Sequence, residues 1–289
     1  MSQVQDALQT PVETTTRLLW NRLCKNRLAL VGSVLIGGFL LLAILAPLLA
    51  PFNPMEQALY DRLEPPTLEH PFGTDDFGRD ILSRVIFGAR ISLRVGVFAV
   101  SIALVIGTSI GLVSGYWGGI LDQILMRIMD LMLAFPSILL AIGIVAVLGP
   151  GLENAMLAIG IVAVPQYARL VRASVLTVRE TDYVLAARAM GASDWRILGV
   201  AILPNCLAPL IVQATLGLAT AILDAAGLSF LGLGAQPPTP EWGAMLSQGR
   251  ELIVRAPWVL TFPGGAIFMT VLAFNLVGDG LRDALDPKS

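Results

Sequence analysis

The sequence has 289 residues, of which 55% are hydrophobic and only 14% are charged. Soluble domains carry about 25% charged residues, so this composition excludes an ordinary soluble protein and indicates a membrane protein. The formal net charge of -2 gives no indication of nucleic-acid binding. A membrane-spanning helix needs about 20 mainly apolar residues, so the chain has room for about six spans and sizeable loops.

Metal and disulfide sites are not predicted. Cys24 and Cys206 have no partner at CxxC or metal-ligand spacing, and His70 is the single histidine. A metal centre needs several such ligands at suitable spacing. We therefore expect no metal site, no disulfide and no cofactor in this chain.

The N-terminal segment, residues 1–27, is polar and ends in a basic cluster. The apolar run after it predicts a first transmembrane helix at 28–50, which is too long for a signal peptide and ends in prolines. Short segments rich in Lys and Arg remain in the cytoplasm, so we expect the N-terminus inside. The basic residues are Arg17, Arg22, Lys25 and Arg27.

Residues 51–91 are expected to form an external, periplasmic loop, because Pro47, Pro51 and Pro54 end the first helix. The motif GTDDFGRD from Gly73 lacks the ligand pattern of a calcium loop and predicts a turn and a helix cap with paired Asp and Arg. Four arginines in this region conflict with an external loop, because positively charged loops usually stay in the cytoplasm. However, three aspartates lie beside them, and the first helix usually sets the orientation of the chain. These residues are Arg79, Arg84, Arg90, Arg94, Asp75, Asp76 and Asp80.

The second, third and fourth spans are predicted at about 92–115, 124–148 and 152–171. In the second span, small residues recur every fourth position, which lets helix backbones approach closely in lipid. These helix-packing residues are Gly107, Gly111 and Gly115. In the third span, Arg127 and Asp130 lie three residues apart and can pair on one helix face, and Pro136 predicts a kink.

A polar stretch of about two dozen residues, from Thr181 to Asn205, interrupts the apolar sequence and lies within a loop expected at about 172–200. Alanines on one side of Gly191 favour a helix with a slim face, and glycine then bends or ends that helix. Five arginines in and beside this stretch place it in the cytoplasm. They are Arg169, Arg172, Arg179, Arg188 and Arg196.

The last part of the chain predicts a fifth span at about 201–223 and a sixth at about 257–277. Residues 224–256 between them are apolar but too broken to span, so they form either a re-entrant or an external periplasmic region. A cytoplasmic tail, 278–289, completes six spans with both termini inside. The predicted fold class is an all-α polytopic membrane protein.

Several motifs resemble one family of transport proteins. Ala186-Ala187, three residues, Gly191, nine residues and then Ala201-Ile202-Leu203-Pro204 resembles the cytoplasmic loop by which inner-membrane subunits of bacterial ATP-driven importers contact their ATPases. Leu185 and Ala201 replace the Glu and Ile of that pattern. Further matches are GARISL from Gly88, LSFLGLGAQPPTPEWG from Leu228 and VLAFNLVGDGLRDALDP from Val271, together with GTDDFGRDILSR. The chain thus resembles permeases of the peptide/nickel group, and PNCLAPLIVQATLG from Pro204 is most similar to dipeptide-permease C subunits.

This resemblance implies a type I ABC importer permease fold with a cytoplasmic coupling helix, in the bacterial inner membrane. It implies a heterodimer with a homologous permease, two ATPase subunits and a periplasmic peptide-binding protein as partners. The implied substrates are dipeptides or short peptides. The residues that it assigns to ATPase coupling are Tyr183, Ala186, Ala187, Arg188, Gly191, Ala192, Leu203 and Pro204.

The sequence leaves alternative functions open. The same group of permeases handles glutathione, nickel complexes and oligopeptides, so another solute is the first alternative. A stand-alone secondary transporter is disfavoured because no internal repeat or mid-span carboxylate is recognisable. Catalysis is disfavoured because the sequence has no HExxH or GxxxxGK[ST] motif and no histidine within any predicted span. We therefore expect a non-enzymatic transport subunit whose ATP is hydrolysed by partners.

Overall fold

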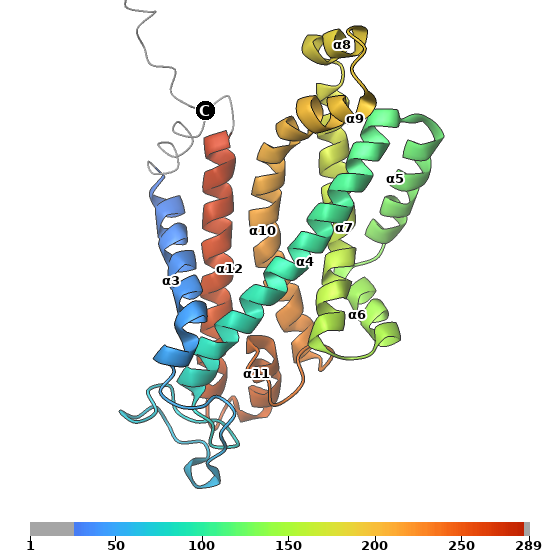
Figure 1. Ribbon diagram of the computed structural model, residues 1–289. Coiled ribbons are helices and arrows are strands. Elements are labelled where there is room, and N and C mark those ends of the chain that lie inside the picture. Colours follow the sequence, from blue (N-terminus) through green and yellow to red (C-terminus); the bar gives the residue numbers. More distant parts are fainter. Residues whose placement is uncertain (1–25, 286–289) are drawn as a thin grey trace, which may run out of the picture.

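The computed structural model describes residues 26–285, which are helical apart from turns and one long irregular segment (Figure 1). Within these residues, five helices are long and apolar enough to cross a membrane, and a bent pair of shorter helices makes a sixth candidate. The predicted all-helical polytopic class is therefore confirmed. The long helices are α3 (Arg27–Leu49), α4 (Ile81–Trp117), α7 (Leu152–Val178), α10 (Leu203–Phe230) and α12 (Trp258–Leu285).

The helices run between two ends of the molecule (Figure 1). One end carries the short helices α8 (Asp182–Ala189) and α9 (Asp194–Arg196), and we call it the α8 end. The other carries α11 (Trp242–Gly249) and the irregular segment 51–80, and we call it the α11 end. Helix α4 crosses the bundle obliquely and packs most extensively against α7, while α3 packs against α12. The expected cytoplasmic segment 1–27 lies almost wholly outside the described residues.

Helix α4 begins well before the apolar sequence does. The prediction had an external loop to residue 91 and a span from 92, but the helix begins at Ile81. Asp80 caps it, because its carboxylate accepts a hydrogen bond from the Ser83 amide at 2.7 Å. Ser83 and Arg84 in the first turn are buried. Hydropathy alone missed this part of the helix because its polar side chains point inward to protein partners.

The predicted third span, 124–148, is two helices rather than one kinked helix. Helices α5 (Gly119–Leu133) and α6 (Ser137–Leu148) meet at an angle of 95° on either side of Pro136. Proline cannot donate the backbone hydrogen bond that a continuous helix needs, and here its position coincides with a complete break. The predicted pairing of Arg127 with Asp130 is wrong, because Asp130 pairs with Arg169 of α7.

The last two spans are longer than predicted. Residues 224–230, which we assigned to the broken region after the fifth span, continue α10 to Phe230. The tail predicted from residue 278 is helical to Leu285 as part of α12. Within 231–256 the chain forms turns, α11 and a 3-10 turn, Arg250–Leu252. Likewise, α7 extends to Val178, so the first residues of the expected loop 172–200 are helical.

The glycine stripe of α4 faces α7. A Cβ atom at Gly107 would lie 2.6 Å from the Cβ of Tyr167, and one at Gly111 would lie 2.6 Å from the carbonyl oxygen of Ala168. At Gly115 it would lie 2.8 Å from the Cβ of Val175. These distances are shorter than real side chains allow, so the two backbones approach as closely as they do only because the α4 positions lack side chains.

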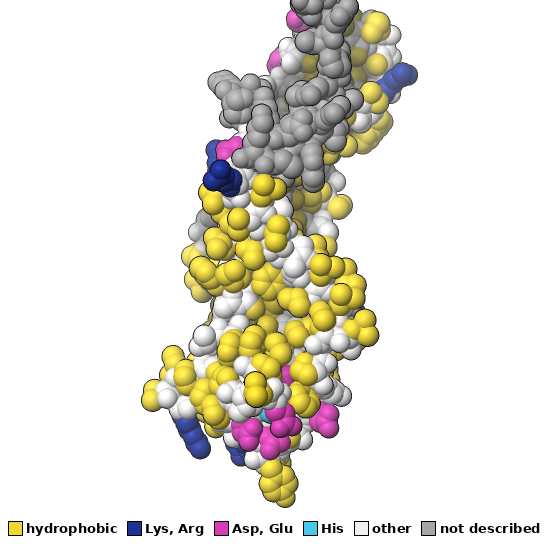
Figure 2. All heavy atoms as spheres, turned by 90° about the vertical axis from the view of Figure 1, so that its left-hand side faces the viewer, with side chains coloured by type: hydrophobic (Ala, Val, Ile, Leu, Met, Phe, Trp, Pro, Cys, Tyr) yellow, Lys and Arg dark blue, Asp and Glu magenta, His cyan; other side chains and the backbone are white. Residues whose placement is uncertain are grey.

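The outside of the bundle is apolar between its two ends. Figure 2 shows hydrophobic side chains over most of the described middle of the face formed by α3 and its neighbours, with acidic side chains gathered at the α11 end. Leu28, Val34, Ile44 and Leu48 of α3 are all more than half exposed. Such a continuous apolar surface would aggregate in water and is stable in a lipid bilayer.

Candidate functional site

The polar stretch predicted for coupling forms a compact projection at the α8 end. Helix α8 ends where the Gly191 amide donates to the Arg188 carbonyl oxygen at 3.0 Å and the Ala192 amide donates to the Ala187 carbonyl oxygen at 3.1 Å. Gly191 has φ = 80°, a left-handed conformation that terminates helices and suits glycine. The residues 181–205 that contain α8, α9 and the next turn are called the α8–α9 element below.

This element has an inner and an outer side. Val184 is fully buried, and Ala187 and Ala192 are half-buried against the main hydrophobic core. Leu185, Met190 and Trp195 are 44%, 81% and 73% exposed, so they form an apolar outer side. Several large apolar side chains exposed on one projecting element are typical of a surface that contacts another protein. Ala186, Arg188 and Gly191 are also exposed on this element.

The element is attached to the end of α4, which is distant from it in sequence. The Tyr116 hydroxyl donates a hydrogen bond to the Asp194 carboxylate at 2.6 Å. The rings of Trp117 and Trp195 meet edge to face with centroids 5.5 Å apart, and the Arg188 guanidinium lies over the Tyr116 ring at 5.6 Å. We call these five residues the α4 clasp.

The end of α4 is in turn fixed to α5 and α7. Arg172 of α7 makes two hydrogen bonds of 2.6 Å to the Asp122 carboxylate of α5. Ser114 of α4 donates to the same carboxylate, and Arg179 donates to the Gly115 carbonyl oxygen at 2.8 Å. Bidentate pairs of this kind hold a defined geometry, so α4, α5 and α7 form one unit at this end.

The element rejoins the bundle through a π-helical turn, Ile197–Ile202, that leads directly into α10. Ile197 and Ile202 are buried, whereas Pro204 is exposed in the first turn of α10, where a missing amide costs little. Leu203 begins α10 and is half-buried. The Tyr183 hydroxyl accepts a hydrogen bond from Asn205 at 3.1 Å, which links α8 to the start of α10.

The α11 end contains a buried polar network instead. Asp75 accepts a 2.7 Å hydrogen bond from Arg79 and lies 3.6 Å from Arg84, and all three side chains are at most 7% exposed. His70 and Asp80 are hydrogen-bonded at 3.0 Å. Two of the four arginines that opposed an external position are therefore neutralised inside the protein and add little to the positive charge at this end.

Glu241 is a further buried acid of the α11 end. Its carboxylate caps α11 by accepting hydrogen bonds from the amides of Gly243 at 3.0 Å and Ala244 at 2.8 Å. Burial raises the pKa of Glu241, while those two amides oppose the rise because they stabilise the charged form. The adjacent Trp242 donates to the Val85 carbonyl oxygen at 3.0 Å, which joins α11 to α4.

All eight residues assigned to coupling lie in the α8–α9 element, but some are exposed and others are half-buried. Ala187 and Ala192 support the element from inside, so the outer surface is formed by other residues. Sequence reasoning missed the exposed Leu185 and Met190 and the α4 clasp. The signal for the clasp was two aromatic residues, Tyr116 and Trp117, at the end of an apolar span, and nothing in their spacing indicated Asp194 as a partner.

Comparison with known proteins agrees with this architecture. Residues 107–289 match the family model described as the binding-protein-dependent transport system inner membrane component, and residues 14–66 match the N-terminal transmembrane domain of oligopeptide transport permease C. The solved structure entitled "Inward facing conformations of the MetNI methionine ABC transporter" has a TM-score of 0.59 and 23% identity, over 71% of this chain and 98% of that chain. The fold is that of a type I ABC importer permease.

The chain belongs to the family of inner-membrane components of binding-protein-dependent transport systems. It is similar to the dipeptide transport system permease protein DppC of Alkalihalophilus pseudofirmus, with 57% identity over 94% of this chain and 90% of the relative. DppC of Escherichia coli is 52% identical over 100% and 99% of the two chains. The glutathione transport system permease protein GsiD of Pectobacterium atrosepticum is 48% identical over 96% and 92%. The chain is therefore a multi-pass permease of the bacterial inner membrane, and its role is in transport.

Proposed function

We propose that this chain is one half of the membrane pathway of an ATP-driven importer for dipeptides and short peptides. Support for peptides comes from the relatives, since those named as dipeptide permeases reach 57% identity and those named as glutathione permeases reach 50%. In this proposal the chain pairs with a homologous permease, and each permease seats one of two ATPase subunits. A periplasmic peptide-binding protein delivers the substrate, and this chain holds no metal or cofactor.

The observation that carries the coupling part is the apolar outer side of the α8–α9 element. Leu185, Met190 and Trp195 are held outward by a buried inner side and by the α4 clasp. An ATPase groove that receives this surface would push or pull α10 through the π-helical turn and α4 through the clasp. The outward movement of an ATPase would thus reach two spans at once as rigid-body motion. The α8 end is cytoplasmic in this proposal, and the α11 end is periplasmic.

The test uses two matched exposed apolar residues at opposite ends. Met190→Asp on the outer side should prevent the ATPase subunits from purifying with the complex and should abolish peptide uptake. Val254→Asp, at a position 93% exposed at the α11 end, should leave ATPase recovery unchanged. Because both side chains are exposed, neither variant should unfold the chain. Full recovery of the ATPases with Met190→Asp would refute the assignment of the docking surface.

The substrate is tested separately by reconstituting the complete complex in vesicles with its binding protein. Uptake of a radiolabelled dipeptide that is inhibited by an unlabelled tripeptide, but not by glutathione, would support the proposal. Saturable uptake of glutathione with no dipeptide uptake would replace it with the first alternative. ATP hydrolysis by this chain purified alone would contradict its role as a subunit without catalytic activity.

A further inference from the structure

Two arginines at the α11 end have no partner in the described chain. Arg90 and Arg94 are exposed, and neither makes a hydrogen bond or an ion pair with any residue between 26 and 285. The acids nearest in sequence are already engaged, since Asp75 binds Arg79 and Arg84, and Asp80 caps α4 and binds His70. The positive charge of Arg90 and Arg94 is therefore available to a ligand.

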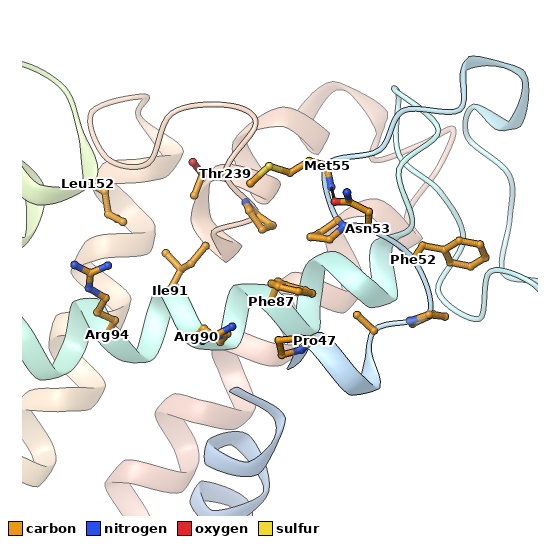
Figure 3. Close-up of a pocket in the computed structure, with 14 residues that line it drawn as sticks. Pro47, Phe52, Asn53, Met55, Phe87, Arg90, Ile91, Arg94, Leu152 and Thr239 are labelled. Carbon is orange, nitrogen blue, oxygen red and sulfur yellow. Dashed lines mark hydrogen bonds between the residues drawn. The ribbon is translucent and has the colours of Figure 1, made fainter. Parts of the chain in front are cut away.

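Both arginines line the same pocket, whose volume is about 940 Å³ (Figure 3). They lie four residues apart on α4, so they share one helix face at a separation of about 6 Å between Cβ atoms. The opposite wall comes from the segment after α3, which includes Met55, and from Thr239 before α11 (Figure 3). Chain segments that are far apart in sequence thus line one pocket together with two exposed, unpaired arginines.

The rest of the pocket wall defines the ligand further. None of the described residues that line it is acidic, and Pro47, Phe52, Phe87 and Ile91 give it an apolar surface. Pockets that bind small molecules have volumes of about 300–1,000 Å³, with apolar walls and few charged groups that fix orientation. Such a site fits a small molecule with a carboxylate at one end and an apolar group beside it. The C-terminal residue of a short peptide has this composition.

We propose that Arg90 and Arg94 bind the C-terminal carboxylate of a peptide as it enters the membrane pathway at the α11 end. The inference rests on the proposed peptide transport and adds the site that the substrate meets in this chain. Guanidinium groups suit this task because they donate several hydrogen bonds in a plane that matches a carboxylate. The neighbouring pair Arg79 and Arg84 cannot serve, since both side chains are buried in the ion network.

The test is a double-mutant cycle in which one change removes the charges of Arg90 and Arg94 and the other removes the C-terminal charge of the peptide. The reconstituted complex with its binding protein is given alanyl-alanine or its C-terminal amide, and kcat/KM for uptake is measured for each. The double variant Arg90→Gln, Arg94→Gln should lose about tenfold in kcat/KM for the acid and change little for the amide. Any preference of the binding protein for the acid is the same in both complexes, so it cancels in the ratio.

Two further variants make the test specific. The double variant Arg90→Lys, Arg94→Lys keeps the charges and should retain more of the rate with the acid than the glutamine variant does. Arg250→Gln removes an exposed arginine elsewhere at the α11 end, whose side chain is 59% exposed, and should have no effect. Complex assembly is checked by the recovery of every subunit for each variant.

The outcomes separate this inference from the proposed function. Unchanged uptake of the acid by the glutamine variant would overturn the inference, and so would an equal loss for acid and amide, which indicates a contact with the partner permease. An effect that disappears in vesicles of phosphatidylethanolamine without phosphatidylglycerol would assign the pocket to a lipid headgroup instead. A wild-type complex that takes up neither alanyl-alanine nor its C-terminal amide would overturn the proposed function and this inference with it.

Discussion

The two ends of this permease are held together by different contacts. At the α11 end, the charged side chains of Asp75, Arg79 and Arg84 form a buried ion network that fixes a long segment with little secondary structure of its own. At the α8 end, apolar side chains such as Met190 and Trp195 are exposed, and a few contacts attach them to the bundle. Breaking a buried ion pair leaves an uncompensated buried charge, whereas an exposed apolar surface is typical of a contact with another protein. The ion network therefore fixes the conformation of the α11 end, whereas the α8 end presents a surface that a partner protein can contact.

The largest effect is expected from breaking the buried network. Asp75→Asn removes the carboxylate that faces both Arg79 and Arg84, so Arg84 loses its ion pair and Arg79 keeps only the longer one with Asp76. Removing one partner of a buried pair costs about 3–5 kcal/mol, so the purified complex should unfold at a much lower temperature. Asp76→Asn is the matched control, because its side chain is 31% exposed and lies 3.9 Å from Arg79. Similar small shifts for both variants would show that the network does not determine the stability of this end.

The next effect tests the contact that joins both ends, the packing of α4 on α7. Gly111→Leu would place a side chain where the Ala168 carbonyl oxygen is 2.6 Å from the ideal Cβ position. Overpacking costs about 1–3 kcal/mol, and the value should be near the upper limit because the obstacle is backbone. Gly38→Leu on α3 is the control, since nothing lies within 4 Å of a Cβ there. Thermal unfolding of the two variants in detergent gives the comparison, and equal stability would contradict it.

A smaller effect concerns pH and the cap of α11. Burial raises the pKa of Glu241 above its ordinary value of 4.5, so the folded protein holds this proton more tightly than the unfolded chain does. The contribution of Glu241 to stability is therefore greatest below pH 4.5 and is lost as the pH rises through the raised value. The free energy of unfolding of the wild type, relative to Glu241→Gln, should fall as the pH rises through this range.

The Glu241→Gln variant also changes the cap itself. A glutamine, like a protonated carboxyl, has one carbonyl acceptor for the two amides of Gly243 and Ala244, so a bond worth about 1–2 kcal/mol is lost only relative to the charged form. The two proteins should therefore be closest in stability at low pH, and chemical unfolding at several pH values measures how the difference between them changes. A difference between the two proteins that does not vary with pH would show that Glu241 has the same pKa in the folded and unfolded chains.

Much of this architecture could be predicted from the sequence, because it depends on local signals. Apolar runs located the spans, the glycine stripe indicated close helix packing, and Gly191 marked the end of a short helix. The errors have a common cause. Arg84 and Ser83 made a helix look like a loop, and Asp130 was assigned to a partner on its own helix, because the partners of polar side chains are set by tertiary packing. The sequence does not show that Arg79 and Arg84 are paired while Arg90 and Arg94 are unpaired. Only the folded structure distinguishes the two pairs.

The smallest expected effect on stability tests whether the α8 end transmits motion. Tyr116→Phe removes the 2.6 Å hydrogen bond to Asp194 and keeps the ring that faces Arg188. The loss of one partly exposed hydrogen bond should cost about 1 kcal/mol, and the ATPase subunits should still purify with the complex. Peptide-stimulated ATP hydrolysis should nevertheless fall severalfold, because the α8–α9 element can then move without carrying α4 with it. Ser109→Ala removes a hydroxyl on the same helix that bonds only its own backbone, so it should leave stimulation unchanged. If peptide stimulates ATP hydrolysis equally in the Tyr116→Phe and Ser109→Ala variants, the motion of the ATPase passes to α10 alone. The α4 clasp then serves only to hold the α8–α9 element in place.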